Sequence, residues 1–97
     1  MIVNKEKGNF KVENALGSRA RIKILKLLAL NNELSITQII KKTKLNHSSV
    51  IKHLNFLKSL NIIQEKRFGR IKIFRFKTEN IKAISLKKFI EIWESEF

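Results

Sequence analysis

The chain has 97 residues, which is enough for one compact domain and too few for two. Its 21 Lys and Arg residues stand against eight Glu and no Asp, so the formal net charge is +13 and the expected partner is nucleic acid or an anionic membrane. The absence of cysteine excludes disulfides, thiolate zinc sites and cysteine nucleophiles. With no Asp and two His, catalytic triads and carboxylate-rich metal cages are nearly excluded, and we expect no enzyme, no metal and no cofactor.

The positive charge is concentrated in one part of the chain. Residues 41–77 contain eleven basic residues and one acidic residue, Glu65, whereas residues 78–97 contain three Lys and four Glu. We therefore expect the electrostatic function in the middle third. No segment has the roughly 20 consecutive apolar residues of a membrane-spanning helix. The first five residues lack the apolar core of a signal peptide, so a cytoplasmic protein is the expectation.

The first predicted helix covers residues 18–30. It follows a polar segment, residues 1–14, that we expect to be a partly ordered N-terminal arm. Arg19, Lys23 and Lys26 form a narrow polar stripe at helical spacing, and the rest of the helix surface is apolar. A helix this apolar should be covered on two sides, by its own core and by another element or subunit.

Two short helices follow across a tight connection. Ser35 and Gln38 fit a capping box at the start of a helix that runs through Thr43. Asn46 is a suitable N-cap for the next helix, over residues 47–60. The expected buried face of that helix consists of Val50, Leu54 and Leu57. Two helices joined by about three residues predict a helix-turn-helix.

A β-hairpin and a last helix complete the predicted fold. The strands cover residues 62–66 and 71–76, and their connection contains Gly69, a residue that hairpin turns favour. The last helix covers residues 80–95 and has one strong apolar face. A hairpin after the second helix of a helix-turn-helix is a wing. The sequence therefore predicts a mainly α (α+β) winged helix-turn-helix with a two-stranded β-wing.

Four segments of the chain resemble the ArsR-type winged helix-turn-helix transcriptional regulators. Residues 15–25 (ALGSRARIKIL) resemble the opening helix of that family, and residues 34–39 (LSITQI) resemble the start of its first helix-turn-helix element. Residues 45–57 (LNHSSVIKHLNFL) resemble its recognition helix, and residues 67–76 (RFGRIKIFRF) resemble its wing. The resemblance implies DNA binding and dimerisation.

Two departures from the family pattern matter. Lys44 occupies a turn position where the family usually has Gly, and a left-handed backbone there would cost about 1 kcal/mol. The family's metal sensors carry Cys on a helix, or His with Asp and Glu on the last helix. This chain has no Cys, no Asp and no His outside the recognition helix, so metal sensing is not expected.

The recognition helix has a polar stripe opposite its buried face. Ser48, Lys52, Asn55 and Ser59 repeat at helical spacing, where side chains could reach base edges in the major groove. Basic residues crowd the wing, and Arg in such a loop commonly enters a narrow minor groove or rests on phosphates. The alternative is a solvated helix face and a charged hairpin that only keeps the protein soluble. The expected DNA contacts are His47, Ser48, Ser49, Ile51, Lys52 and Asn55 on the helix, Lys66, Arg67, Phe68, Arg70 and Lys72 in the wing, and Lys41, Lys42 and Lys44 at phosphates.

Two of the side chains in this region have more than one interpretation. His53 shares a side of the recognition helix with apolar residues, and we expect a hydrogen-bonded, half-buried structural His rather than a metal ligand. Phe68 either packs under the wing turn or lies against the sugar edge of DNA.

The first and last helices have more apolar surface than one small domain would cover. A two-fold dimer through them would place two recognition helices one DNA turn, about 34 Å, apart. The expected interface residues are Ile22, Leu86, Phe89, Ile90, Trp93 and Phe97. The alternative for these side chains is packing in the core of the single domain. The chain then divides into an N-terminal arm (1–14), a DNA-binding domain (15–78) and a dimerisation helix (79–97).

The sequence thus predicts a homodimeric, sequence-specific transcriptional regulator of double-stranded DNA, acting as a repressor and associated with the nucleoid. One alternative is an architectural protein that coats DNA without sequence preference, because the charge alone would support it. Another is a winged-helix module that binds protein or RNA. An inducible sensor would need a small-molecule pocket, and the sequence shows none.

Overall fold

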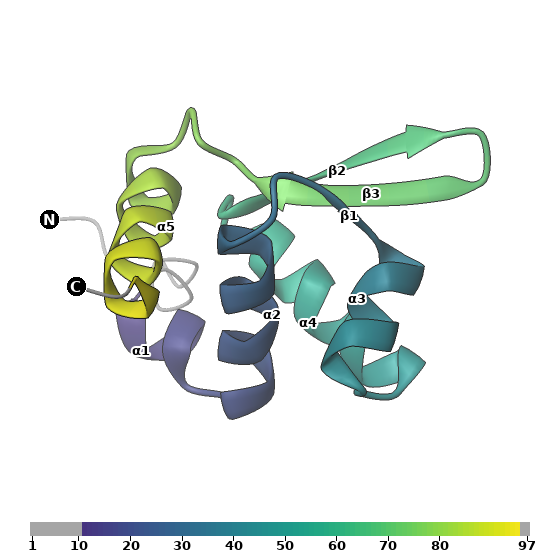
Figure 1. The fold of residues 1–97 in the computed structure, drawn as a ribbon, viewed down its shortest axis with the longest axis horizontal. Coiled ribbons are helices and arrows are strands. Elements are labelled where there is room, and N and C mark those ends of the chain that lie inside the picture. The colour runs from purple at the N-terminus through teal and green to yellow at the C-terminus, as the bar shows by residue number, and fades with distance from the viewer. Residues whose placement is uncertain (1–10, 96–97) are drawn as a thin grey trace, which may run out of the picture.

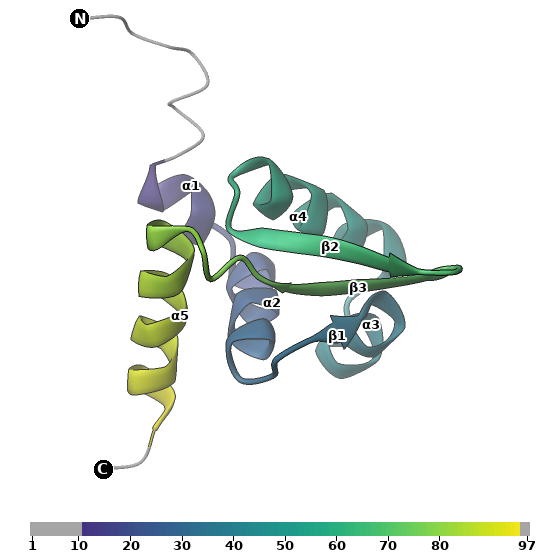
Figure 2. The same cartoon turned by 90° about the horizontal axis from the view of Figure 1, so that it is seen from above.

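The computed structural model describes residues 11–95 and is drawn as a ribbon in Figures 1 and 2. Five helices and three strands make up this part of the chain. In chain order they are α1 (Val12–Leu16), α2 (Arg19–Ala29), β1 (Leu34–Ser35), α3 (Ile36–Thr43), α4 (His47–Ser59), β2 (Ile63–Phe68), β3 (Ile71–Phe76) and α5 (Ile81–Glu94). The strands form one antiparallel sheet in the order β1-β3-β2. The predicted winged helix-turn-helix is confirmed.

Polar caps set the helix boundaries that the sequence predicts. The Ser35 hydroxyl accepts a hydrogen bond from the Gln38 backbone N–H, and the Gln38 side chain accepts one from the Ser35 N–H, so the capping box is complete. The Asn46 side chain accepts from the Ser49 N–H at the start of α4, and Asn80 caps α5 in the same way. These bonds use backbone donors that the first turn of a helix leaves unpaired.

The hydrophobic core lies between the helices and the inner face of the sheet, with α2 packed against α1, α3, α4, α5 and β3. Side chains alternate across a strand, so Phe74 and Phe76 of β3 point into the core while Arg75 points away. The other large side chains buried most completely are Ile24, Leu25, Leu28, Ile39, Val50, Leu54 and Leu57. This set contains the whole predicted buried face of α4. Burying each of these side chains contributes about 1.5–3 kcal/mol.

The segment before α2 is more ordered than the sequence predicts. Residues 12–14, expected in the N-terminal arm, instead form the first turn of α1. Ala15 of this helix is buried, and packing against α2 stabilises a helix that is too short to be stable alone. The rest of the expected arm, residues 1–10, lies outside the described residues.

The sheet is larger than the predicted two-stranded wing. Leu34 and Ser35 form a third strand, because they pair with the middle of β3 across the sheet from β2. The first wing strand covers residues 63–68 rather than 62–66, since its pairing with β3 continues through Phe68 to a two-residue turn. The prediction of the second wing strand, residues 71–76, is confirmed.

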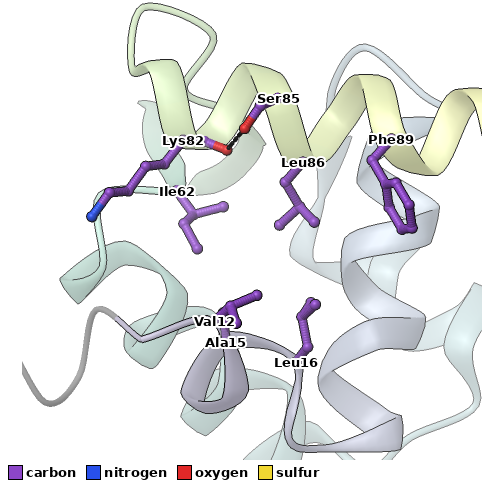
Figure 3. Close-up of a pocket in the computed structure, with 8 residues that line it drawn as sticks. All are labelled: Val12, Ala15, Leu16, Ile62, Lys82, Ser85, Leu86 and Phe89. Atoms are coloured by element: carbon purple, nitrogen blue, oxygen red, sulfur yellow. Dashed lines mark hydrogen bonds between the residues drawn. The ribbon is translucent and has the colours of Figure 1, made fainter.

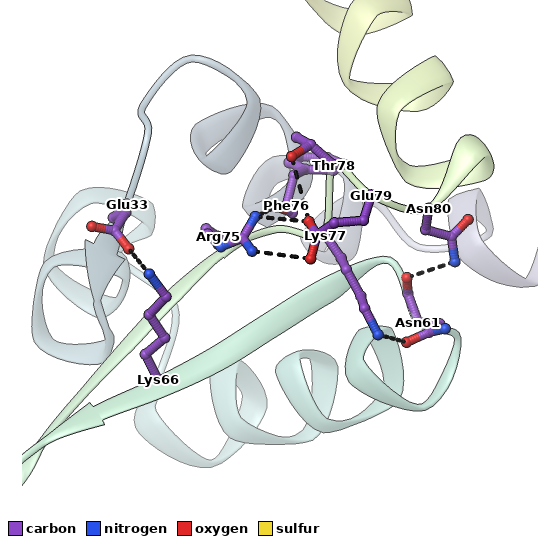
Figure 4. Close-up of polar contacts among 9 residues, drawn as sticks. All are labelled: Glu33, Asn61, Lys66, Arg75, Phe76, Lys77, Thr78, Glu79 and Asn80. Carbon is purple, nitrogen blue, oxygen red and sulfur yellow. Dashed lines mark hydrogen bonds and ion pairs between the residues drawn. The ribbon is translucent and has the colours of Figure 1, made fainter.

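Polar contacts fix the start of α5 to the end of α4 (Figure 4). The Lys77 ammonium donates to the Asn61 side-chain oxygen at 2.8 Å, and the Asn80 amide donates to the Asn61 backbone carbonyl at 3.0 Å. Asn61 has φ 64°, the left-handed conformation expected just past a helix. Arg75 pairs with Glu79 at 3.2 Å on the same connection. In this arrangement α5 lies at the opposite end of the molecule from the wing tip (Figures 1 and 2).

Candidate nucleic-acid interface

The outward face of α4 is polar. Ser48, Lys52, Asn55 and Ser59 are exposed along the helix, opposite its buried residues, and His47 is exposed at its N-terminus. The exposed stripe predicted from the periodicity is therefore confirmed as a surface. Whether it contacts DNA stays a prediction.

The first turn of α4 is held in place by Asn46. Its Oδ1 accepts hydrogen bonds from the Ser49 N–H at 2.8 Å and from the Ser48 hydroxyl at 3.0 Å. The Ser48 oxygen can still accept a bond from a base amino group. Ser49 and Ile51 are half-buried, so these two predicted contacts offer less surface than the stripe does.

The last turn of α3 and the connection to α4 carry three lysines at the surface. Lys41, Lys42 and Lys44 are exposed, and none of them forms an ion pair within residues 11–95. The Thr43 hydroxyl donates to the Ile39 carbonyl at 2.7 Å and closes the end of α3. Lysines in this arrangement suit phosphates, which position a protein on DNA without conveying sequence.

The replacement Lys44→Gly should stabilise the protein. Lys44 has φ 61°, a left-handed conformation that favours glycine, so the side chain costs about 1 kcal/mol. Part of this cost is offset by the greater freedom of glycine in the unfolded chain. We expect a net gain of about 0.5 kcal/mol, or about 2–4 °C in Tm. The control Lys42→Gly, inside α3, should destabilise the protein by about 1 kcal/mol. Equal losses of Tm in both variants would refute the strain at Lys44.

The tip of the wing is exposed. Its strands are joined by the turn Gly69–Arg70, where Gly69 has φ 62°, a conformation that glycine adopts without strain. Phe68 is 60% exposed, and its cross-strand partner Ile71 is also exposed. The structure thus excludes packing of Phe68 under the turn. Arg70 is exposed as well and forms no ion pair in the described part of the chain.

The other basic residues of the wing differ in their partners. The Lys66 ammonium lies 3.5 Å from the Glu33 carboxylate (Figure 4), and Arg67 Nε lies 3.1 Å from Glu65. Lys72 is half-buried. An exposed ion pair contributes about 0–1 kcal/mol, so a phosphate could replace Glu33 beside Lys66 with little loss.

His53 lies on the inner side of α4 and is half-buried, as predicted. The predicted hydrogen bond is wrong for Nδ1, because this buried atom has no partner among residues 11–95. The guanidinium of the neighbouring Arg21 stacks on the Phe56 ring, 4.3 Å from its centroid, and does not donate a hydrogen bond to Nδ1 of the imidazole. Burial lowers the pKa of His53, and the positive charges of Arg21 and Lys52 lower that pKa further.

Protonation of His53 should therefore destabilise the fold. Because its pKa lies below the ordinary 6.5 in the folded protein, the unfolded chain binds this proton more readily. The stability that depends on neutral His53 is complete above about pH 6.5 and is lost as the pH falls from there through the folded-state pKa. Urea unfolding between pH 7 and 5 should show a smaller loss for His53→Gln than for the wild type. Parallel pH profiles for the two proteins would rule out this effect.

A second surface, far from the wing, is apolar. On α5, Trp93 is 74% exposed and Phe89 is 56% exposed, with their ring centroids 5.8 Å apart. Ile22 of α2 is exposed and lines a shallow depression with both of them. Leu86 and Ile90, also predicted at an interface, are half-buried against the molecule's own core.

Sequence reasoning missed other exposed apolar residues of α1 and α5. Val12, Ile81 and Ile92 are exposed as well. Ile81 and Ile92 are eleven residues apart, which is three helical turns, so a second apolar stripe on α5 was the available signal. Phe97, the remaining predicted interface residue, lies outside the described residues.

An apolar groove runs between α1 and α5 on the same surface (Figure 3). Its volume is about 470 Å³. The side chains that face one another across it are Val12, Ala15 and Leu16 on one side and Ile62, Leu86 and Phe89 on the other. Continuous exposed apolar surface of this kind marks contact sites for other molecules.

Neither a metal centre nor a membrane segment is found in the part of the chain that the structure describes. No three His, Asp, Glu or Cys side chains in residues 11–95 come close enough together to hold a metal ion. In the same residues, no helix combines the length and the apolarity that crossing a membrane requires.

Comparison with known sequences identifies a family. Residues 18–65 match the model of a family described as bacterial regulatory protein, arsR family. An uncharacterized HTH-type transcriptional regulator of Methanocaldococcus jannaschii is 31% identical over 70 residues, which are 72% of this chain and 79% of that protein. The matched region contains the helix-turn-helix on which the sequence resemblance depends.

Two solved structures share the fold. The transcriptional repressor PagR of Bacillus anthracis is 22% identical, with a TM-score of 0.71 over 93% of this chain and 94% of that one. A homodimeric winged helix-turn-helix DNA-binding domain from Mycobacterium bovis, a possible ArsR-family regulator, is 24% identical, with a TM-score of 0.73 over 91% and 77%. These structures establish the fold, and the sequence matches establish the family. The chain therefore belongs to the ArsR family of winged helix-turn-helix, DNA-binding transcriptional regulators.

Proposed function

We propose that the protein is a homodimeric repressor that binds specific sites in double-stranded DNA. The observation that carries this proposal is the exposed polar stripe of α4 beside a basic wing, on a domain of a DNA-binding family. In Figure 2, α4 lies alongside β2, and the hairpin extends beyond it. An α-helix fits the major groove, and a loop beside it can reach the adjacent minor groove or its phosphates.

The proposed DNA contacts are of two kinds, contacts to phosphates and contacts to bases. Lys41, Lys42 and Lys44 neutralise phosphates, which releases counterions and sets the position on DNA without reading sequence. Asn55 can form two hydrogen bonds with adenine, and Lys52 can reach guanine or a phosphate. The remaining proposed contacts are His47, Ser48, Ser49 and Ile51 on α4, and Lys66, Arg67, Phe68, Arg70 and Lys72 in the wing.

The second copy packs on the apolar surface of α2 and α5. Exposed Trp93, Phe89 and Ile22, with the groove of Figure 3, support this assignment. Aromatic side chains bury about 150–250 Å² each and dominate the energetics of interfaces. The similar domain from M. bovis is homodimeric. In this proposal residues 15–78 bind DNA, residues 79–97 supply the dimer helix, and the groove belongs to the interface rather than to a small effector.

Repression is the proposed outcome of binding. A dimer that occupies a site overlapping a promoter blocks access of the transcription machinery, and the similar PagR is a transcriptional repressor. Binding to the chromosome would place the protein on the nucleoid in the cytoplasm.

The salt dependence of binding tests the DNA contact. If a dimer neutralises six to eight phosphates, a plot of log affinity against log salt should have a slope of roughly −5 to −7. Fluorescence anisotropy with a labelled duplex measures this slope, and unlabelled duplex should compete better than single-stranded RNA. A slope near zero, or stronger competition by RNA, would instead support the module that binds protein or RNA.

A further inference from the structure

Glu65 is an acidic residue in the most basic segment of the chain. It is the only acidic residue among residues 41–77, and its side chain is 15% exposed on β2. Lys58 Nζ, at the end of α4, donates to Glu65 Oε1 at 2.8 Å, and Arg67 Nε, farther along the wing, donates to Oε2 at 3.1 Å. One carboxylate therefore connects the recognition helix to the wing.

The carboxylate lies where the proposed base-reading and wing contacts meet. Glu65 lines a small cleft of about 50 Å³ between α4 and the sheet, together with Asn55 of α4 and Lys72 of β3. The hydrogen bonds from Lys58 and Arg67, with the nearby charge of Lys72, hold the pKa of Glu65 below its usual value. Glu65 is thus negatively charged at neutral pH.

A negative charge at this place has different effects on two kinds of complex. Non-specific binding depends on the attraction between basic residues and phosphates, so an anion in the surface weakens it. Specific binding depends also on side chains held in register with base edges. The ion pairs of Glu65 fix two long cationic side chains that would otherwise have to be ordered when DNA binds.

We propose that Glu65 is a positioning residue that raises the preference for a specific site over random duplex DNA. It does so by holding Lys58 and Arg67 at fixed places between helix and wing and by weakening complexes that depend on charge alone. This inference rests on the proposed function, because it assumes that α4 and the wing bind DNA together. It adds Lys58 and Glu65 to the functional surface, although neither side chain is expected to read a base.

The test compares Glu65→Gln with the control Glu79→Gln. Both variants lose one negative charge and an ion pair with Arg, but Glu79 lies on the connection to α5, outside the cleft (Figure 4). We expect Glu65→Gln to bind random duplex about 3–10-fold more tightly, with a salt slope steeper by about 1–2. Affinity for the specific site should stay nearly unchanged, because the loss of positioning offsets the gain in charge, so the ratio of specific to random affinity falls about 3–10-fold. In Glu79→Gln both affinities should shift together, by less than about 2-fold.

A double-mutant cycle with Lys58→Met tests whether Glu65 acts through its ion pair with Lys58. If Glu65 acts by holding Lys58, each single variant lowers the ratio of specific to random affinity. The double variant then lowers this ratio by less than the product of the two single fold-changes. An unchanged ratio in Glu65→Gln, an equal fall in Glu79→Gln, or independent effects of the two substitutions would overturn the inference. Thermal melts of each variant identify any loss of folding. A wild-type protein that binds all duplexes equally would instead contradict the proposed function, and the wild-type affinities alone reveal this.

Discussion

Replacing Phe89 by glutamate should convert the proposed dimer to a monomer and lower the affinity for a specific site by about 30–1,000-fold. Phe89 is exposed in the single chain, lies 5.8 Å from Trp93 and lines both apolar depressions on the proposed interface. A central aromatic residue of an interface typically contributes about 2–4 kcal/mol, and a carboxylate buried there would lose its hydration. A monomer also binds only half of a two-fold site.

Sedimentation and anisotropy together measure this outcome. Phe89→Glu should sediment as a monomer at micromolar concentrations and keep its helical content, because the residue packs little against its own core. The control Thr78→Glu makes the same charge change at an exposed position between β3 and α5 and should leave the dimer and the affinity nearly unchanged. A dimeric Phe89→Glu variant with normal affinity would show that the protein associates through another surface.

The second large effect is expected from Asn55→Ala. Asn55 is exposed in the middle of the α4 stripe, where its amide can form two hydrogen bonds with an adenine. Losing these bonds should cost about 1–3 kcal/mol at the specific site, or about 5–150-fold in affinity, with little change for random duplex. Replacing each base pair of the site in turn should show relaxed choice at one position of each half-site.

The variant Lys42→Ala serves as the comparison for Asn55→Ala, because it removes a phosphate contact instead of a base contact. Lys42 is exposed on α3, and its proposed partner is a phosphate. Its removal should weaken specific and random duplexes alike and make the salt slope shallower by about 1 for each subunit. If Asn55→Ala also weakened all sequences equally, then Asn55 would be a backbone contact, and the base-reading side chains would have to lie elsewhere on α4.

Helices α2 to α5 can be predicted from the sequence because their signals are local. The capping residues Ser35, Asn46 and Asn80 each lie within three residues of the N–H group that they cap. The buried face of α4 repeats with the helical period, and its three predicted residues are all buried. Exposure of the opposite stripe follows from the same pattern. The central part of the candidate interface is therefore visible in the sequence.

The features that the sequence does not predict depend on tertiary contacts rather than on local sequence. Strand β1 has only two residues, too few to show an alternating pattern, and it exists because β3 pairs with it. The ion pair between Glu33 and Lys66 joins residues that are far apart in sequence and meet across the sheet. Lys58 and Glu65 are only seven residues apart, but their pairing requires β2 to fold back along α4. The composition gives the net charge of the chain, but it does not show which Lys and Arg side chains already form ion pairs with Glu.

Protection mapping on genomic DNA is the most direct test of sequence-specific binding. The proposed function requires α4 and the wing of two joined subunits to recognise particular base sequences rather than to bind through charge alone. At physiological salt, it predicts a few discrete protected sites, each a pseudo-palindrome whose half-sites are about 34 Å apart on one face of the duplex. Continuous protection without preferred sequences would contradict it and would identify the protein as an architectural coat on DNA.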